Sequence, residues 1–224
     1  MQKGVKFRIY PNKEQQTIIN QTLGCCRLIY NKGLAMRNEA YQNGNKIGYT
    51  QTSAMLTDLK KSDDFAFLKV VDSIALQQSL RDLDRGFVNF FQKRARHPQF
   101  KSKHNRHQSY RTINQGDNIR IVGKYIKLPK LGYVKVRQSM EVGKINNVTI
   151  EHTPTGKYFA VLNIEFEPQP MNNKGGKIGI DVGIKEFYSD SNGNVVYNPK
   201  YLEKSMRKLI REQRKLSRKE KGSS

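Results

Sequence analysis

The chain has 224 residues, with 41 Lys and Arg against 19 Asp and Glu, and carries a formal net charge of +22 at pH 7. Such an excess of cations repels itself unless a polyanion neutralises it, which argues against a free metabolic enzyme and for a nucleic acid or an anionic membrane as partner. No run of about 18 apolar residues could span a membrane, no secretory signal opens the chain, and the two cysteines are the adjacent Cys25 and Cys26. We therefore expect a cytoplasmic, nucleic-acid-binding protein.

The first half of the chain predicts one strand followed by helices. Residues 5–10 alternate apolar and basic side chains, as a half-buried strand does, and Pro11-Asn12 ends the run. Apolar spacing then predicts helices at 13–42, about 52–60 and about 73–96, with Asp72 as the N-cap of the last. We expect Gly24 and Gly33 to weaken the first helix and to mark positions of close packing. The third helix carries a stripe typical of a bundle core: Leu76, Leu80, Leu83, Phe87, Phe90 and Phe91.

The second half predicts antiparallel strands at 118–122, 125–128, 133–137, 147–151 and 158–164, separated by turn residues. The strand at 5–10 could join them, which would make the helices of 13–96 an insertion in a β-barrel. Residues 168–176 have the composition of a linker, and a new unit begins at Lys177. In that unit we expect an apolar strand at 177–183, a hairpin about Asn192-Gly193 and a basic helix from about 199 to 221.

The stretch between Asp84 and Asp117 contains no acidic residue. Cations there would neutralise phosphates and release counterions, and rings between them would stack on unpaired bases. The alternative is a solvated, disordered charged loop, but the charge of the whole chain favours nucleic-acid contact. The basic residues are Arg85, Lys93, Arg94, Arg96, Lys101, Lys103, Arg106 and Arg111, with Phe100, His104, His107 and Tyr110 interleaved.

The predicted C-terminal helix is a second basic element, with ten Lys or Arg and three Glu over residues 200–221. Its narrow apolar stripe could lie on a membrane, or could pack against protein while the cationic stripe follows a nucleic-acid backbone. The absence of Trp makes the membrane alternative the weaker one. Small polar side chains elsewhere could read base edges, although most such residues are ordinary surface: Tyr49, Gln51, Thr52, Gln77, Gln78, Thr112, Asn114 and Gln115.

Asp181 is the single acid on the apolar run of residues 178–183. Burying a carboxylate without a partner is costly, and a bound divalent cation is one remedy. The pattern fits the first metal-binding Asp of an RNase H-like nuclease, in which two metals clamp the attacking and leaving oxygens. The alternative is a strand-end Asp that caps a turn.

Several segments together resemble the TnpB family, the transposon-encoded RNA-guided DNA nucleases also known as OrfB transposases. The opening of the chain, residues 6–15, is similar to the family's opening, and residues 179–185 are similar to its first RuvC-like strand. The matching segments occur in the family's order along the whole chain. The others are 27–31, 109–111, 126–132, 216–219 and 221–223.

The resemblance implies an α+β fold: a wedge-like antiparallel β-barrel at 1–12 and 97–170, a helical recognition insertion at 13–96, and the start of an RNase H-like (RuvC) domain at 177–224. It implies a cytoplasmic, nucleoid-associated protein that binds a guide RNA from the transposon end and double-stranded target DNA beside a short flanking motif. For the flanking motif we expect Tyr49, Gln77, Thr112 and Gln115. For RNA we expect the basic segment and the barrel strands. The further residues expected to bind nucleic acid are Lys6, Arg8, Arg27, Lys127 and Lys130.

The chain departs from the family at the nuclease centre, where only Asp181 matches as a catalytic and metal-binding residue. The family uses a further Glu and a final Asp, binds Mg²⁺ and carries a CxxC…CxxC zinc ribbon, whereas this chain has only two adjacent cysteines and no zinc site. Glu186 and Asp190 match neither acidic position. We therefore expect this chain alone not to cut DNA efficiently. The alternatives are a nuclease-dead RNA-guided DNA-binding protein and a general RNA-binding protein.

Overall fold

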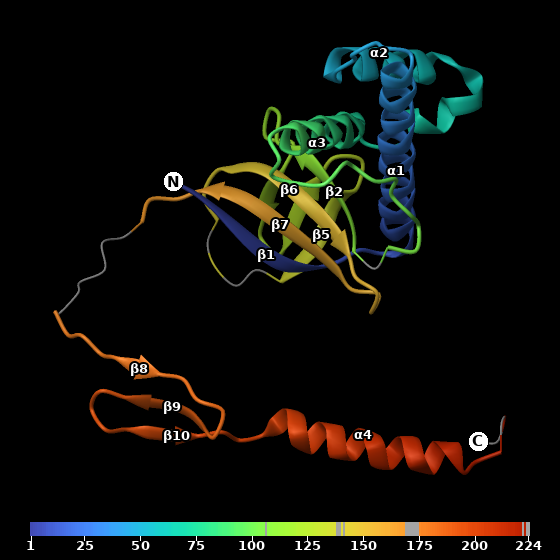
Figure 1. The fold of residues 1–224 in the computed structure, drawn as a ribbon. Coiled ribbons are helices and arrows are strands. Elements are labelled where there is room, and N and C mark those ends of the chain that lie inside the picture. Colours follow the sequence, from blue (N-terminus) through green and yellow to red (C-terminus); the bar gives the residue numbers. More distant parts are fainter. Residues whose placement is uncertain (106, 138–139, 141, 169–174, 221, 223–224) are drawn as a thin grey trace. The chain divides into compact units, whose positions relative to one another are not determined.

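A curled sheet of antiparallel strands organises the first of the chain's two units, Met1–Pro168, while Gln169–Ser224 forms the second. The computed structural model describes residues 1–105, 107–137, 140, 142–168, 175–220 and 222, and its class is α+β, as predicted (Figure 1). The strand order of the large sheet is β2-β6-β7-β1-β5-β4-β3. In chain order the strands are β1 (Gln2–Tyr10), β2 (Gln108–Ile113), β3 (Arg120–Val122), β4 (Tyr125–Leu128), β5 (Gly132–Arg137), β6 (Ile145–His152) and β7 (Tyr158–Glu165).

Strand β1 lies in the middle of this sheet. It pairs with β7 along Gln2–Ile9 and with β5 along Arg8–Tyr10, so the first strand joins the later ones as expected. In chain order, the helices of this unit come between β1 and β2. The β-barrel expected from the sequence is present in part, as a curled sheet, because β2 and β3 remain the two edges of the sheet and do not pair with each other in the described residues.

Asn114, in the loop that joins the edge strands β2 and β3, ties this loop to the start of β6 through its side chain. Its Nδ2 donates to the carbonyl oxygens of Ile119 and Ile145 at 3.0 and 2.9 Å, and its Oδ1 accepts from the Ile119 N–H at 2.9 Å. One side-chain amide thus takes the place of ladder hydrogen bonds where the chain turns from β2 to β3. Strand β3 itself has only 3 residues. The result is a half-barrel.

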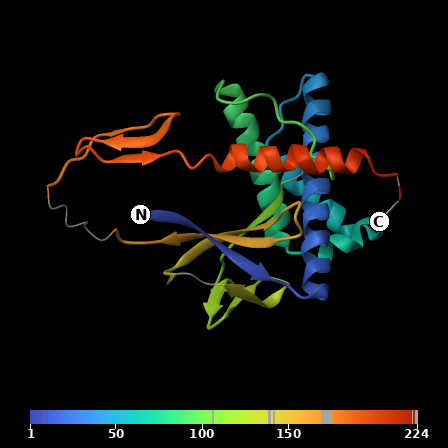
Figure 2. The same ribbon diagram turned by 90° about the horizontal axis from the view of Figure 1, so that it is seen from below.

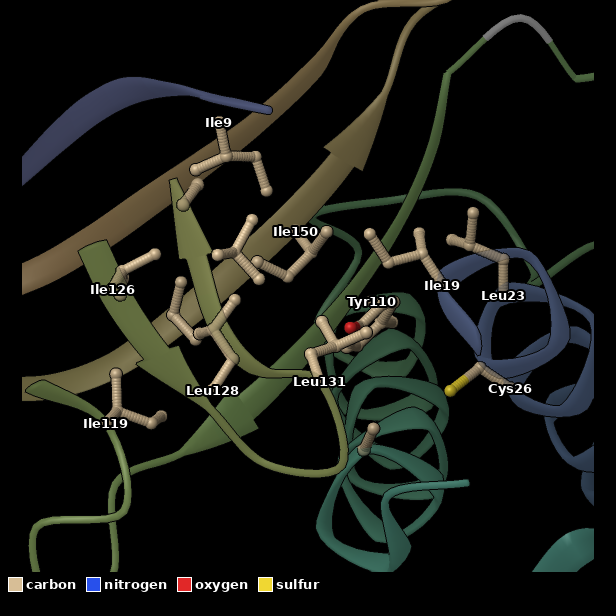
Figure 3. Packing of buried hydrophobic residues seen from close by; sticks show 14 of the residues in the cluster. Ile9, Ile19, Leu23, Cys26, Tyr110, Ile119, Ile126, Leu128, Leu131 and Ile150 are labelled. Carbon is tan, nitrogen blue, oxygen red and sulfur yellow. The ribbon is translucent and has the colours of Figure 1, made fainter. Parts of the chain in front are cut away.

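The inner face of the half-barrel holds the main core. Residues 5, 7 and 9 of β1 and residues 126, 128, 134 and 136 of β4 and β5 are buried, and the residues between them are more exposed. Figure 3 shows Ile126, Leu128 and Ile150 of the sheet gathered on this face, with Ile19 and Leu23 of the first helix beyond Tyr110. The period of two predicted from the sequence therefore places one face of the sheet in the core.

The helices of the first unit are α1 (Lys13–Gln42), α2 (Tyr49–Lys61), the 3-10 helix η1 (Asp63–Lys69) and α3 (Ser73–Phe91). Figures 1 and 2 show that α1 extends well past the sheet. Its N-terminal half joins the sheet core, while Tyr30 and Leu34 further along form a separate cluster with Leu83 and Phe87 of α3. The helices thus form a second layer whose far end carries a core of its own.

Side-chain caps fix where these helices begin. Asn12 Oδ1 accepts from the Gln15 N–H at 2.8 Å, and Gln15 Oε1 accepts from the Asn12 N–H at 3.0 Å, which makes a capping box at the start of α1. Gln15 Nε2 also donates to the carbonyls of Leu131 and Tyr133, so this cap ties α1 to the sheet. At α3 the predicted N-cap is confirmed, because Asp72 Oδ1 accepts from the Ile74 N–H at 2.9 Å.

Helix α3 ends at Phe91, whereas the sequence predicted an end near Arg96. Lys93 adopts a left-handed φ of 59°, its N–H donates to Phe90 O, and the Arg94 N–H donates to Asn89 O. These two bonds form a Schellman motif, which usually has glycine at the left-handed position. Residues 93–96 therefore leave the helix as an exposed loop.

The second unit contains a small sheet of β8 (Ile180–Asp181), β9 (Glu186–Asp190) and β10 (Val195–Tyr197), and the helix α4 (Tyr201–Ser217). The hairpin predicted about Asn192-Gly193 is confirmed, with Gly193 at a φ of 83°. The apolar strand is shorter than predicted, since β8 has 2 residues. Beyond it Gly179 still pairs with Ser191, whose Oγ accepts from the Gly179 N–H and whose N–H donates to Gly179 O. Most of the predicted linker, residues 169–174, lies outside the described residues.

Helix α4 is exposed along its whole length, including its apolar stripe of Met206, Leu209, Ile210 and Leu216. Its basic residues partly pair with glutamates on the same helix, as Arg207 does with Glu203. None of the helices in the described residues has the length and hydropathy that a membrane span requires.

Candidate nucleic-acid interface

The exposed face of strands β1, β3, β4 and β5 carries cations and tyrosines. These side chains alternate with the buried core residues, so all of them lie on the same side of the sheet. Pairs of positive charges and rings of this kind suit phosphates and unpaired bases. We call this set the sheet outer face: Lys6, Arg8, Tyr10, Arg120, Tyr125, Lys127, Tyr133, Lys135 and Arg137.

Strand register places like charges directly opposite one another on the sheet outer face. Arg8 pairs with Arg137 across β1 and β5, and Arg120 pairs with Lys127 across β3 and β4. Directly opposed cations in a sheet are destabilising. The free protein therefore keeps a repulsive arrangement on this face, and a bound polyanion would relieve it.

Aromatic rings hold the cations of β1 in place. The Arg8 guanidinium carbon lies 5.3 Å from the Phe159 ring centroid and 5.4 Å from that of Tyr10. Lys6 Nζ lies 4.6 Å from the Phe159 centroid and also forms an ion pair with Glu151. The Arg8 Nε is buried and has no hydrogen-bond partner among the described residues.

Of the two other predicted residues, Lys127 lies on this face and Lys130 lies beside it. Lys127 stands on β4 opposite Tyr133 of β5, with its side chain partly buried. Lys130 is exposed in the turn after β4, where its φ of 63° lies in the left-handed region. Lys127 thus belongs to the sheet outer face, and Lys130 extends its charge to the turn.

The basic segment, residues 93–111, is anchored to α1 in its middle. Asn31 Nδ2 donates to Lys101 O at 3.0 Å, and the Lys101 N–H donates to Asn31 Oδ1 at 2.8 Å. Lys101 Nζ lies 4.2 Å from the Tyr30 ring centroid. Desolvation of this ammonium end lowers the pKa of Lys101, an effect that the nearby Asp82 carboxylate opposes. Although the residue as a whole is exposed, its charge is held against α1.

The remaining cations of the basic segment differ in whether they are exposed or held in an ion pair. Lys93, Arg94, Arg96 and Lys103 are exposed, and Arg106 lies outside the described residues. Arg111 forms an ion pair with Asp82, which ties β2 to α3.

Arg27 and Lys101 share a small polar pocket of about 110 Å³ with His107, Gln108 and Ser109. Arg27 comes from α1 and is partly buried, while Lys101 and His107 come from the basic segment. The structure therefore brings Arg27 together with this segment. The pocket is smaller than the roughly 300–1,000 Å³ usual for a small-molecule site, which leaves a single phosphate or a water cluster as occupants of suitable size.

The four residues predicted for the flanking motif lie in different settings. The Tyr49 ring packs under Arg81, with 4.5 Å between the guanidinium carbon and the ring centroid, and Gln77 is exposed on α3. Gln115 is exposed in the loop after β2. Thr112 is only 2% exposed, so its predicted contact with DNA has no surface to support it in this conformation.

The other small polar side chains considered from the sequence serve local structure. Gln51 accepts from the Gly48 N–H at the start of α2, and the Thr52 hydroxyl donates to Tyr49 O. Asn114 joins the sheet edges, and Gln78 is buried. Gln51, Thr52 and Asn114 thus use their polar side chains to bond the backbone of their own fold.

Asp181 is exposed on β8 and pairs in register with Ser189. Asp190, on the neighbouring strand, accepts from the backbone N–H groups of Asn192 and Asn194 and from Asn194 Nδ2. These bonds lower the pKa of Asp190 and commit its carboxylate to the hairpin turn. Across the described ranges, no cluster of three or more His, Cys, Asp or Glu could hold a metal ion.

Sequence reasoning missed most of the sheet outer face. Tyr10, Tyr125, Tyr133, Lys135 and Arg137 were read only as strand residues, although each alternates with a buried neighbour. That alternation was the available signal. It shows that they face solvent, but it does not show which strands lie side by side.

Two protein-family models match parts of the chain. A helix-turn-helix domain model of the OrfB_IS605 type matches residues 1–46, and an OrfB_IS605 model described as "Probable transposase" matches residues 148–224. Within residues 1–46 the structure has strand β1 and one helix, α1.

Three curated proteins are similar to the chain. A "Putative RNA-guided DNA endonuclease" of Streptomyces pristinaespiralis is 34% identical over 228 residues, covering 100% of this chain and 56% of that protein. The Escherichia coli K12 protein "Putative RNA-guided DNA endonuclease InsQ" is 36% identical over 222 residues, covering 98% and 54%. "Virulence protein VsdF" of Salmonella dublin is 36% identical over 115 residues, covering 46% and 96%. The chain thus spans about half the length of the first two relatives.

Proposed function

Because the chain belongs to the OrfB family of IS605-type transposon proteins, the family of TnpB, we propose that it binds a transposon-end guide RNA and target DNA as part of an RNA-guided DNA endonuclease. Two of its relatives carry the name RNA-guided DNA endonuclease, and both are similar to this chain along nearly its whole length. In this scheme base pairing reads the target sequence, and the protein holds the RNA by shape and charge.

The opposed cations of the sheet outer face are the observation that carries this proposal. Arg8 stands opposite Arg137, and Arg120 opposite Lys127, although neutral residues there would make a more stable sheet. Tyr125 and Tyr133 are about half exposed between these charges. A face that combines phosphate-binding cations with exposed rings favours a nucleic acid over an anionic membrane.

The proposed division of labour follows the family. Residues 1–12 and 97–170 would form the wedge-like domain that holds RNA, residues 13–96 would form the helical recognition insertion, and residues 177–224 would begin a RuvC-like domain. Within the insertion, Tyr49 and Gln77 are the proposed readers of the flanking DNA motif, with Gln115 from the loop after β2. The anchored basic segment would hold RNA next to them.

The described residues do not fit the two-metal centre that such an endonuclease requires. Asp181 is one carboxylate, and Asp190, which stands opposite Ile180, is occupied by three hydrogen bonds of the hairpin turn. A two-metal centre needs several free carboxylates around both ions. We therefore propose that this 224-residue chain alone binds nucleic acid without cutting DNA efficiently.

Purifying the protein from its host and sequencing the RNA that accompanies it tests the proposal. One abundant transposon-end RNA is the expected result, and a mixture of RNAs with steeply salt-dependent binding would instead indicate a general RNA-binding protein. Adding guide RNA, Mg²⁺ and matched duplex DNA then tests cleavage. Robust cutting by the chain alone contradicts the proposal. If the chain is a nuclease-dead RNA-guided protein, Asp181→Ala will leave its activity unchanged.

A further inference from the structure

A cavity lined by aromatic rings opens where α3 ends. It has a volume of about 530 Å³ and is lined by Phe87, Phe90 and Phe91 of α3, Tyr41 of α1 and His97 from the loop that follows α3. Helices α1 and α3 pack against each other, and the cavity lies between residues near their C-terminal ends. This volume lies within the roughly 300–1,000 Å³ usual for ligand sites.

These rings were expected to fill a helix-bundle core, and two of them do not. Phe87 is buried in the cluster with Tyr30, Leu34 and Leu83, whereas Phe91 is 69% exposed and Phe90 is partly buried. Tyr41, on the other wall, is 74% exposed. Ring surface of this size left in water is unfavourable for the free protein and marks an interaction site.

The rings are held in a fixed arrangement. His97 packs edge-on to both Phe87 and Phe90, with ring centroids 5.3 and 5.2 Å apart. Its Nδ1 lies 2.8 Å from Pro98 O and must donate, because a carbonyl oxygen can only accept. Gly86 lies next to Pro98, since a Cβ there would be in van der Waals contact with Pro98 Cγ at 3.4 Å.

The charge around the cavity is positive. Between Phe91 and His97 the chain carries three exposed cations, Lys93, Arg94 and Arg96, and no acid. Lys46 lines the cavity, and none of the described residues that line it is acidic. Arg37, the other cation in the lining, is neutralised by Asp84 at 2.9 Å and packs 4.2 Å from the Phe87 centroid, so it supports the wall.

We propose that this cavity, named here the aromatic pocket, binds an unpaired nucleobase by stacking it on Phe90 and Phe91 while Lys93, Arg94 and Arg96 hold the adjoining phosphates. The inference rests on the proposed nucleic-acid-binding function and adds to it a specific site for a single-stranded nucleotide. Rings flanked by cations within a few residues match both parts of a nucleotide, the base and the phosphate. An apolar protein segment would use the rings but leave the cations without partners.

The test measures binding of the full chain to short oligonucleotides of one sequence, as single-stranded RNA, single-stranded DNA and duplex DNA. Phe90→Leu combined with Phe91→Leu keeps apolar surface but removes both rings. We expect this variant to bind the single strands about tenfold more weakly, as loss of stacking for one base predicts, and the duplex as tightly as the wild type. Phe90→Tyr with Phe91→Tyr keeps the rings and should retain affinity.

A matched control is Phe67→Leu, which removes a ring that is 46% exposed on η1, away from the aromatic pocket. It should leave all affinities unchanged. If the double Leu variant binds only single-stranded RNA more weakly, RNA is the source of the base. If it binds both single-stranded RNA and single-stranded DNA more weakly, the site accepts a base from either.

Three results would overturn the inference. If the double Leu variant binds single strands as tightly as the wild type, the aromatic pocket is not the binding site, but the proposed function is unaffected. Equal weakening toward single strands and duplex shows that the rings act without selecting an unpaired base. Wild-type protein that binds none of the probes overturns the proposed function as well.

Discussion

Asn31 and Lys101 are joined by two hydrogen bonds that run in opposite directions, from Asn31 Nδ2 to Lys101 O and from the Lys101 N–H to Asn31 Oδ1. The side-chain amide of α1 thereby acts as a strand partner for one residue of the basic segment. This pairing fixes the segment's path across α1 and presents its cations in a defined place.

Replacing Asn31 by Ala should lower the free energy of unfolding by about 1–3 kcal/mol, since each lost hydrogen bond contributes roughly 0.5–1.5 kcal/mol. Urea denaturation measures this loss, and hydrogen exchange at the Lys101 amide should accelerate. Asn20→Ala, on an exposed position of the same helix, is the control and should change stability by less than about 0.5 kcal/mol. Equal effects at the two positions would show that the pairing contributes nothing.

The two glycines of α1 should respond oppositely to alanine. A Cβ at Gly33 would lie 2.9 Å from Leu80 Cδ2 and 3.0 Å from Leu83 Cδ2, both buried, whereas a Cβ at Gly24 meets nothing within 4 Å. Gly24→Ala should therefore raise the unfolding free energy by about 0.5–1 kcal/mol through helix propensity. Gly33→Ala should lower it by about 1–3 kcal/mol through overpacking. Thermal melts of both variants decide this, and a gain in stability at Gly33 contradicts the close packing of α1 on α3.

Removing one of two opposed cations should stabilise the free protein and weaken binding. Arg137→Gln relieves repulsion with Arg8, so we expect a gain of about 0.2–1 kcal/mol in unfolding free energy. The same change should make the salt dependence of single-strand RNA binding less steep by about 0.7 on a log–log plot. Lys61→Gln, an exposed cation on α2 paired with Asp58, is the control. A variant that loses stability and keeps the wild-type slope would exclude the sheet outer face as the RNA-binding surface.

Alkaline pH should destabilise the fold through Cys26. Burial, and secondarily the neighbouring Cys25, raise the pKa of the Cys26 thiol. The unfolded thiol ionises above about pH 8.5, while the folded one keeps its proton. Stability from this group is therefore complete below that pH and is lost as the pH rises, at up to about 1.4 kcal/mol per pH unit.

Urea denaturation between about pH 7.5 and 9.5 measures this loss. Cys26→Ala removes the ionisable group and should flatten the dependence, whatever its effect on absolute stability. An unchanged slope in that variant would assign the alkaline loss to another group.

The sequence by itself determined the features that depend on local order along the chain. The spacing of apolar residues predicted α1 and α3, the side chain of Asp72 predicted its cap, and Asn192-Gly193 predicted the hairpin, because each depends on neighbours within a few residues. The charge of the chain and the segments shared with TnpB predicted its family.

Only the tertiary structure decided which of these residues act together. Pairing between β1 and β5 places Arg8 opposite Arg137. The packing of α1 on α3 places Gly33 against Leu80 and Leu83, whereas Gly24 has free space around it. The early end of α3 at the left-handed Lys93 exposes Phe91 instead of burying it. The physical reason is the same in each case: strand register and helix packing are set by contacts between segments far apart in the chain, and no local pattern contains them.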